Sequence, residues 1–257
     1  MGKYLDSHTH LFANNTMDPI EVINNIKTLD MEKVLVICCD IDERVDKALA
    51  LSKEDNTFDI AVGVHPCDIK YYDNNTLSKV KDYCSLKEVV AIGEIGLDYY
   101  WDKDNKDIQK QWFIEQINLA NKLNKPIIIH SRDAIEDTYD ILLNNPVNKK
   151  GILHCFSSSY EMALKFIDLG YYISFGGPIT FKNNRVGKEV ATKIDINYLL
   201  CETDAPYLTP EPFRGKTNQS INVQYVYKEI SKLRDIDLEQ LQDIISNNYN
   251  RLFHNED

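Results

Sequence analysis

Two histidines near the start of the chain, His8 and His10, have a spacing suited to metal chemistry. They lie at the end of Tyr4–His10, which comprises the first strand-forming segment and the residues that leave it. Alternate side chains of an extended segment point to the same face, so the two imidazoles lie on one side of the strand. Neutral imidazole nitrogen is a good ligand for zinc, manganese, nickel and similar ions. The pair therefore predicts a divalent-metal site, provided that other segments supply further ligands.

Further histidines and acids follow other strand-forming segments. His65 follows Ile60–Val64, Glu94 follows Val89–Ile92, His130 follows Ile127–Ile129, His154 follows Ile152–Leu153 and Asp204 follows Tyr198–Cys201. Of the six histidines, only His254 in the polar tail lacks this placement. Burying so many polar groups for structural reasons alone would cost desolvation free energy. Their shared placement therefore predicts one functional cluster.

Eight strand-forming segments alternate with helical stretches along the chain. The segments are Tyr4–Asp6, Val34–Cys38, Ile60–Val64, Val89–Ile92, Ile127–Ile129, Ile152–Leu153, Tyr171–Phe175 and Tyr198–Cys201. The clearest helix is predicted over Asp107–Asn124, and Asp18-Pro19-Ile20-Glu21 predicts the start of another. The alternation predicts a (β/α)8 TIM barrel, with an open doubly wound α/β sheet as the alternative. The barrel is favoured because its chemistry lies where strands end, and the polar residues fall there.

The composition indicates a single domain spanning residues 1–257. Hydrophobic residues occupy 43% of the chain, enough for a substantial core, and no linker-like tract divides it. The net charge of −11 argues against a broad basic surface for nucleic acid, so an anionic substrate must be held locally. No apolar stretch approaches the roughly 18 residues of a membrane span. We expect a cytoplasmic protein without membrane contact or an obligate protein partner.

The six cysteines predict free thiols and not a disulfide framework. They lack Cys-x-x-Cys spacing, and several lie in apolar strand segments. Cys155 adjoins His154, but a thiol nucleophile is not expected there because His154 is better used as a metal ligand.

The predicted cluster offers more ligands than one tetrahedral ion needs. We therefore expect two divalent ions that share a carboxylate, and Glu94 is the acid expected near the four imidazoles. One ion is expected at His8 and His10. The other is expected at His130 and His154.

Asp204 is expected to act as the general base. A metal can lower the pKa of bound water to about 7, and a neighbouring carboxylate can then accept its proton. The alternative is a structural role for Asp204 as the cap of a helix after Pro206.

Five motifs in the chain form a recognisable set. They are Asp6-x-His8-x-His10, Gly93-Glu94-Ile95-Gly96-Leu97-Asp98-Tyr99, His130-Ser131-Arg132, His154-Cys155-Phe156-Ser157 and Glu202-Thr203-Asp204-Ala205-Pro206-Tyr207-Leu208. Together they resemble the signatures of TatD-type metal-dependent deoxyribonucleases, within the amidohydrolase superfamily. The resemblance extends to Asn250-Arg251-Leu252-Phe253 near the end of the chain.

This resemblance implies a barrel that binds up to two divalent ions, such as Mg, Mn or Zn. The implied ligands are His8, His10, Glu94, His130, His154 and Asp204. It also implies that DNA ends are the substrate, hydrolysed by a 3′–5′ exodeoxyribonuclease that uses metal-activated hydroxide and Asp204 as base. His65 and Arg132 would face the substrate phosphate.

Two segments depart from the family pattern. Ser158 stands where the family usually has glycine after the His154–Ser157 motif. In place of the family's Arg-Gly-Lys-Arg-Asn-Glu-Pro, the chain has Arg214-Gly215-Lys216-Thr217-Asn218-Gln219-Ser220. We expect Arg214 and Lys216 to bind substrate phosphate. The departures should therefore affect substrate affinity and not metal binding.

Two alternatives to DNA hydrolysis stay open from the sequence. The same centre could hydrolyse an amide, lactone or ester, because activated hydroxide attacks carbonyl carbon as well as phosphorus. The chain could also be a non-catalytic, metal-loaded protein that binds nucleic-acid ends.

The aromatic residues Tyr99, Tyr100 and Trp101 could stack on a terminal base, although loop packing explains them equally well.

Overall fold

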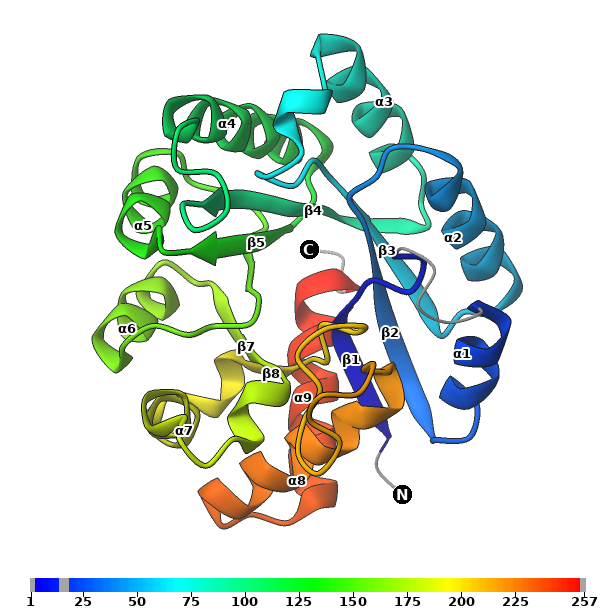
Figure 1. The fold of residues 1–257 in the computed structure, drawn as a ribbon, viewed down its shortest axis with the longest axis vertical. Helices are drawn as coiled ribbons and strands as arrows, with labels where there is room; N and C mark the ends of the chain where they lie inside the picture. The colour runs from blue at the N-terminus through cyan, green and yellow to red at the C-terminus, as the bar shows by residue number, and fades with distance from the viewer. Residues whose placement is uncertain (1–2, 14–18, 255–257) are drawn as a thin grey trace.

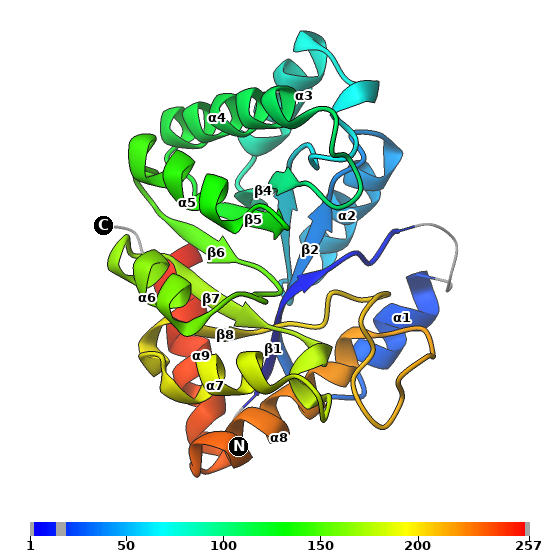
Figure 2. The same ribbon diagram turned by 60° about the vertical axis from the view of Figure 1, so that its left-hand side comes forward.

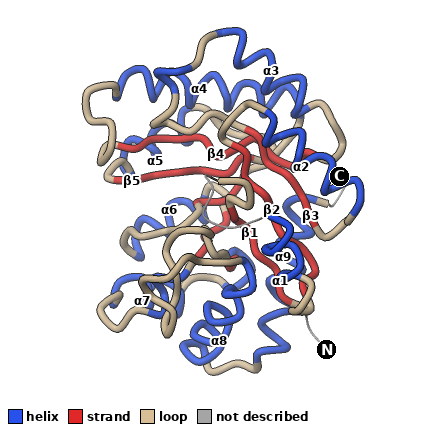
Figure 3. Tube along the Cα trace, turned by 45° about the vertical axis from the view of Figure 1, so that its right-hand side comes forward, coloured by secondary structure: helices blue, strands red, loops and turns tan. Residues whose placement is uncertain are grey.

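Eight parallel strands surrounded by helices make up the computed structural model, which describes residues 3–13 and 19–254 (Figure 1). The strands are β1 (Tyr4–Thr9), β2 (Met31–Cys38), β3 (Phe58–Val62), β4 (Val89–Asp98), β5 (Ile127–Arg132), β6 (Gly151–Leu153), β7 (Tyr172–Phe175) and β8 (Leu199–Cys201). The α-helices are α1 (Pro19–Ile26), α2 (Glu43–Glu54), α3 (Asn74–Cys84), α4 (Lys106–Leu123), α5 (Ile135–Asn144), α6 (Tyr160–Asp168), α7 (Arg185–Lys193), α8 (Val223–Arg234) and α9 (Leu238–Phe253). The short 3-10 helices are η1 (Ile69–Tyr71), η2 (Gly177–Thr180), η3 (Ile196–Tyr198) and η4 (Ser220–Asn222). Figures 2 and 3 show the strands in the interior and the helices outside them.

The strands follow one another around the barrel in sequence order, each parallel to the next. This order confirms the predicted (β/α)8 TIM barrel, because an open doubly wound sheet would reverse its strand order at a switch point. The segment after β8 joins β1 and nearly closes the ring. The His10 N–H donates to the Ala205 carbonyl (2.7 Å) and the Asp204 N–H donates to the His8 carbonyl (2.9 Å). Closure therefore places Asp204 beside His8 and His10.

Two predicted helices can be compared with the structure. The helix predicted over Asp107–Asn124 forms as α4 over Lys106–Leu123. The other begins at Pro19, as expected for a proline at the first helical position, while the predicted cap Asp18 lies outside the described residues. Within the described part of the chain, no helix combines the length and apolar character needed to cross a membrane.

The strands β4 and β5 run further than the sequence predicts. Glu94 lies within β4 and not after it, and His130 lies within β5. Gly96 makes this extension possible because its φ is +139° and a Cβ atom there would lie 2.1 Å from the His130 carbonyl oxygen. The two backbones therefore approach closely where the candidate site residues emerge.

Buried glutamines of α4 support the ends of β3 and β4. The Gln116 side chain accepts the Val64 N–H (2.8 Å) and donates to the Val64 carbonyl (3.1 Å). The Gln109 side chain likewise accepts a hydrogen bond from the Asp98 N–H (2.8 Å) and donates one to the Asp98 carbonyl (3.0 Å). These bonds satisfy backbone groups at the strand ends that would otherwise be buried without partners.

A second polar cluster lies at the opposite end of the barrel. Asp59, near the start of β3, accepts a hydrogen bond from the Tyr249 hydroxyl (2.9 Å) and pairs with His254 (2.8 Å) and Lys33 (3.0 Å). Burial would raise the pKa of Asp59, but His254 and Lys33 hold it below its ordinary value. His254 therefore has a structural role, consistent with its exclusion from the predicted cluster.

Candidate metal centre

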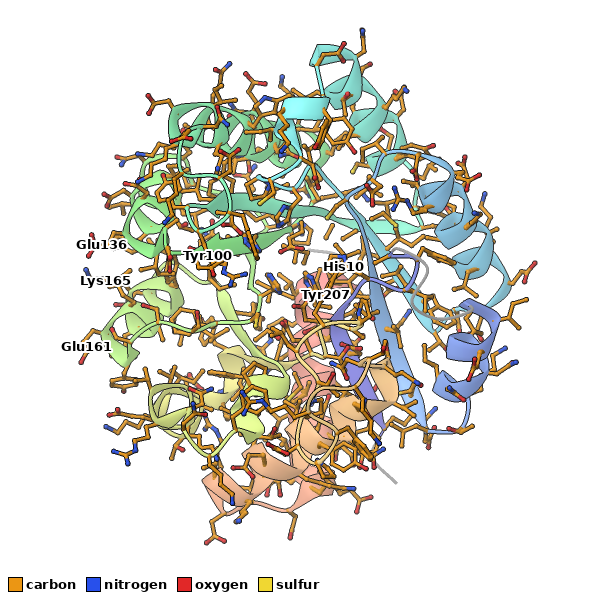
Figure 4. All side chains as sticks on the ribbon, viewed as in Figure 1. His10, Tyr100, Glu136, Glu161, Lys165 and Tyr207 are labelled. Atoms are coloured by element: carbon orange, nitrogen blue, oxygen red, sulfur yellow. The ribbon has the colours of Figure 1, made fainter. Side chains whose placement is uncertain are left out.

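The structure brings the six predicted metal ligands together at the barrel mouth, the end at which the strands terminate. His8 and His10 come from β1 and the residue after it, Glu94 from β4, His130 from β5, His154 from the end of β6, and Asp204 from the segment after β8. Figure 4 labels His10 near the middle of the ring of strands. All six side chains are buried or half-buried, so their polar atoms must satisfy one another or an ion.

The first group of donor atoms belongs to His8, His10, Asp204 and one oxygen of Glu94. The Nε2 atoms of His8 and His10 are 3.2 Å apart. Glu94 Oε2 lies 3.4 and 3.5 Å from these nitrogens, and Asp204 Oδ1 lies 3.8 and 3.5 Å from them. Two ligands about 2.1 Å from one ion are themselves roughly 3 to 3.5 Å apart. The spacing therefore fits one divalent ion.

The second group faces the other oxygen of Glu94. Glu94 Oε1 lies 2.7 Å from His130 Nδ1 and 2.7 Å from His154 Nε2. The two nitrogens are 3.3 Å apart. These three atoms can hold a second ion after a small outward shift of the side chains. Glu94 thus presents one oxygen to each group, as a bridging carboxylate must.

Two acids that the sequence analysis gave no role, Asp98 and Glu202, orient the histidines of the second group. His130 Nε2 is 2.9 Å from Asp98 Oδ2, and His154 Nδ1 is 3.2 Å from Glu202 Oε1. If each of these nitrogens carries the ring proton and donates a hydrogen bond to its acid, His130 Nδ1 and His154 Nε2 are free to bind an ion. Both acids belong to motifs quoted in the sequence analysis, and that membership is the sequence signal that could have identified their role.

Burial and mutual pairing set the charges in the cluster. Burial alone would raise the pKa of Glu94, but the charges of His154 and His8 hold it well below its ordinary value. Burial alone would lower the pKa of His10, but hydrogen bonds to Asp204 and Glu94 raise it to about 9. The protonated imidazole thus supplies positive charge where a bound cation would supply it instead. The donor set of imidazoles and ionised carboxylates fits a divalent metal.

The backbone around Asp204 is fixed on both sides. Asp6 accepts hydrogen bonds from the Thr203 N–H (2.9 Å) and hydroxyl (2.6 Å). Asn218 Nδ2 donates to the carbonyls of Thr203 (2.9 Å) and Tyr207 (2.7 Å). These bonds hold the segment that carries Asp204 against β1.

The alternative role of Asp204 as a helix cap is wrong. The described chain after Pro206 is irregular up to η4 at Ser220–Asn222, so no helix begins where Asp204 could cap it. The side chain of Asp204 is instead directed at His8 and His10.

His65 is the only one of the four predicted phosphate-binding residues that lies against the donor atoms in the described structure. Its Nε2 is 3.9 Å from Glu94 Oε1. Its Nδ1 accepts the Cys67 N–H (3.1 Å), which leaves the ring proton on Nε2. Burial and the neighbouring His130 lower the pKa of His65 to about 3. His65 is therefore a neutral hydrogen-bond donor facing the cluster.

In the other three predicted phosphate-binding residues, the charged group lies over an aromatic ring. Arg132 lies over Tyr100 (4.1 Å), Arg214 over Phe181 (4.3 Å) and Lys216 over Phe213 (5.6 Å). These rings belong to the loops after β4, β7 and β8. The three cations therefore lie on the mouth side of the barrel but not among the donor atoms.

The cysteines are free thiols in the structure, as predicted. Burial and the charge of Glu202 raise the pKa of Cys155 well above its ordinary value, which disfavours a thiolate nucleophile. Cys39 was not predicted as a site residue, yet its sulfur lies within 4.8 Å of ligand atoms of His10 and Glu94. It directly follows β2, the same placement that identified the histidines.

Three of the four residues that depart from the family pattern, Ser158, Gln219 and Ser220, have identifiable surroundings in the structure. Ser158 lines a cavity of about 430 Å³ together with His154. Gln219 accepts a hydrogen bond from Asn25 (3.0 Å), and the Ser220 hydroxyl lies 3.2 Å from that of Thr9. Both contacts join the loop before α8 to the N-terminal part of the chain.

Comparisons with known proteins give a consistent match. A family model described as TatD related DNase matches residues 5–254. The metal-dependent hydrolase YabD of Bacillus subtilis is 42% identical over 250 residues, covering 96% of this chain and 98% of YabD. The metal-dependent hydrolase YcfH of Escherichia coli is 35% identical over 255 residues, covering 97% of this chain and 95% of YcfH.

A solved structure gives the same result for the fold. The crystal structure of YjjV, a TatD homolog from Escherichia coli, superimposes with a TM-score of 0.91 at 28% identity. The match covers 98% of both chains. The similarity therefore includes every strand that contributes to the candidate metal centre.

Proposed function

Because this chain belongs to the family of TatD-related DNases and is a metal-dependent hydrolase, we propose that it hydrolyses DNA phosphodiester bonds with two divalent ions. One observation carries this proposal: the two oxygens of Glu94 face two separate sets of imidazole nitrogens. Glu94 and the two sets of imidazoles would hold a pair of divalent ions, which would supply charge stabilisation for displacement at phosphorus.

Each ion would be held by its own histidine pair. His8 and His10 would hold the first, with Asp204 as an additional ligand. His130 and His154 would hold the second, with Glu94 shared by both. Ions bound there would lower the pKa of water and polarise a phosphate oxygen. Imidazole-rich sites with carboxylates accept Mg, Mn or Zn, so the proposal does not depend on one metal.

Asp204 would accept the proton of the attacking water. Burial alone would raise its pKa, but the hydrogen bond to His10 and the neighbouring imidazole charges hold it below its ordinary value. The carboxylate is therefore ionised at neutral pH and able to act as a base. Its second oxygen can take the proton while Oδ1 stays near His10.

Substrate binding would be local and directed to a chain end. The neutral His65 would donate from Nε2 to a phosphate oxygen, and Arg132, Arg214 and Lys216 would attract phosphates to the mouth. The net charge of −11 disfavours holding a long duplex by its backbone. We therefore propose cleavage at DNA ends. The 3′–5′ direction is what the resemblance to TatD-type deoxyribonucleases implies.

A substrate screen tests this proposal. The protein is stripped of metal, reloaded separately with Mg, Mn and Zn, and assayed on end-labelled single-stranded DNA, closed circular DNA, and amide, lactone and ester substrates. We expect metal-dependent release of nucleotides from the 3′ end and little cutting of closed circles. Turnover of acyl substrates without DNA cleavage would instead support the alternative hydrolase, and binding of DNA ends without turnover would support a non-catalytic role.

A further inference from the structure

Two exposed aromatic side chains lie in the loop after β4. Tyr100 is 46% exposed and Trp101 is 69% exposed, and their rings meet edge to face at 4.8 Å. The adjacent Tyr99 differs, because it is buried and its hydroxyl donates to Asp137 at 2.6 Å. Loop packing therefore explains Tyr99 but leaves Tyr100 and Trp101 open to solvent.

The turn that carries these rings is rigidly held. Asp98 Oδ1 accepts the N–H groups of Tyr100 (2.9 Å) and Trp101 (2.8 Å). Gln109 Nε2 donates to the carbonyls of Asp98 (3.0 Å) and Asp102 (2.8 Å) on either side of the turn. An ordered turn that exposes two large rings is preorganised for binding, because little conformational entropy remains to be lost.

The same turn is connected directly to the metal centre. Asp98 uses its other oxygen, Oδ2, to bind His130 Nε2 at 2.9 Å. Asp98 also pairs in register with Arg132 of β5, whose guanidinium lies 4.1 Å from the Tyr100 ring centre and 5.5 Å from that of Trp101. Figure 4 labels Tyr100 near β5 and His10 nearer the middle of the ring of strands. One carboxylate thus fixes both a metal-facing histidine and the aromatic turn.

We propose that Tyr100, Trp101 and Arg132 form a subsite that stacks the unpaired nucleobase next to the scissile phosphate. This inference rests on the proposed DNA hydrolysis. Aromatic rings and guanidinium planes both stack on bases, and their stacking is independent of base sequence. Stacking also supplies binding affinity that does not depend on counterion release, which suits a chain with a net charge of −11. The subsite would favour single-stranded ends, because a paired base must first leave its duplex.

Tryptophan fluorescence measures this stacking directly. The chain has two tryptophans, and Trp112→Phe leaves Trp101 as the reporter. The metal-loaded Asp204→Asn, Trp112→Phe protein is titrated with a short single-stranded oligonucleotide and with the same oligonucleotide carrying abasic residues at its 3′ end. We expect quenching and roughly 5- to 150-fold tighter binding for the oligonucleotide with bases. Equal quenching and equal affinity for both would overturn the proposal.

Kinetics on the Trp101→Ala variant give an independent test. In wild-type protein, kcat/KM should be higher for the DNA with bases than for the abasic DNA, and in Trp101→Ala this ratio should approach one. Tyr71→Ala is the matched control, because Tyr71 is also an exposed aromatic residue beside a cation. It lies on η1, is 72% exposed, and has the Lys70 ammonium over its ring. The control should keep the wild-type ratio. A wild-type ratio in Trp101→Ala would refute the subsite.

The two proposals fail in different ways. If wild-type protein cleaves neither oligonucleotide with any metal, the proposed DNA hydrolysis is wrong. If wild-type protein cleaves both equally well, DNA hydrolysis stands and only the stacking subsite is wrong.

Discussion

Replacing Asp204 with asparagine separates a general base from a mere ligand. The change keeps the shape of the side chain and one carbonyl oxygen but removes the charge and the basic oxygen. Asp204 Oδ1 lies 3.5 Å from His10 Nε2 and 3.8 Å from His8 Nε2, so it is one of several donors in the first group. With Glu94 and both histidines in place, we expect the variant to fold and to retain metal, with somewhat weaker binding at the first position.

The expected loss is in turnover. Removing a positioned general base lowers kcat by about 10²- to 10⁴-fold, or about 2.7 to 5.5 kcal/mol in the activation barrier. Metal content, melting temperature and kcat should be measured on one preparation. Asp137→Asn is the matched control, since Asp137 lies on α5 and pairs with Lys110 at 2.7 Å. It should keep normal kcat. Near wild-type kcat in Asp204→Asn at full metal content would remove Asp204 from the mechanism.

Four further predictions concern the centre and its surroundings. Asp98→Asn should weaken binding of the second ion by about 10- to 100-fold, measured by metal titration, because it loosens His130; unchanged affinity would show that Asp98 does not orient that ring. The double variant Arg214→Ala, Lys216→Ala should raise KM for DNA more than it lowers kcat, and loss of metal would contradict a role limited to substrate. Metal affinity should increase as pH rises toward about 9, because the pKa of His10 is raised and its proton must leave when an ion binds. Calorimetry in buffers of different ionisation enthalpy would detect the released proton. A metal affinity that does not change with pH would contradict this prediction. By the same linkage, His10 should stabilise the metal-free protein fully below its unfolded pKa near 6.5, and this contribution should be lost as pH rises through about 9.

The barrel and the main cluster could be predicted from the sequence because parallel strands end on one side. His8, Glu94 and Asp204 are far apart in the chain, but each follows or ends an apolar strand segment. Once eight such segments alternate with helices, the topology itself brings the polar residues to one mouth. No knowledge of side-chain conformation is needed for that step.

The contacts that depend on side-chain direction could not be predicted in this way. Asp98 and Glu202 orient histidines, and their role appears only when the distances to the ring nitrogens are known. The contact of the Arg132 guanidinium with the Tyr100 ring also depends on side-chain direction and is not visible in the sequence. Strand length was also underestimated, because Gly96 permits β4 to continue beside β5 where the sequence pattern indicates a break.

Electron paramagnetic resonance of the Mn-loaded protein reports whether two ions share Glu94. At full loading we expect two Mn ions per chain and a spin-coupled spectrum with half the hyperfine spacing of isolated Mn. Glu94→Gln should lose this coupling. A spectrum of isolated Mn from fully loaded wild-type protein, or one bound ion per chain at saturation, would contradict the bridged pair.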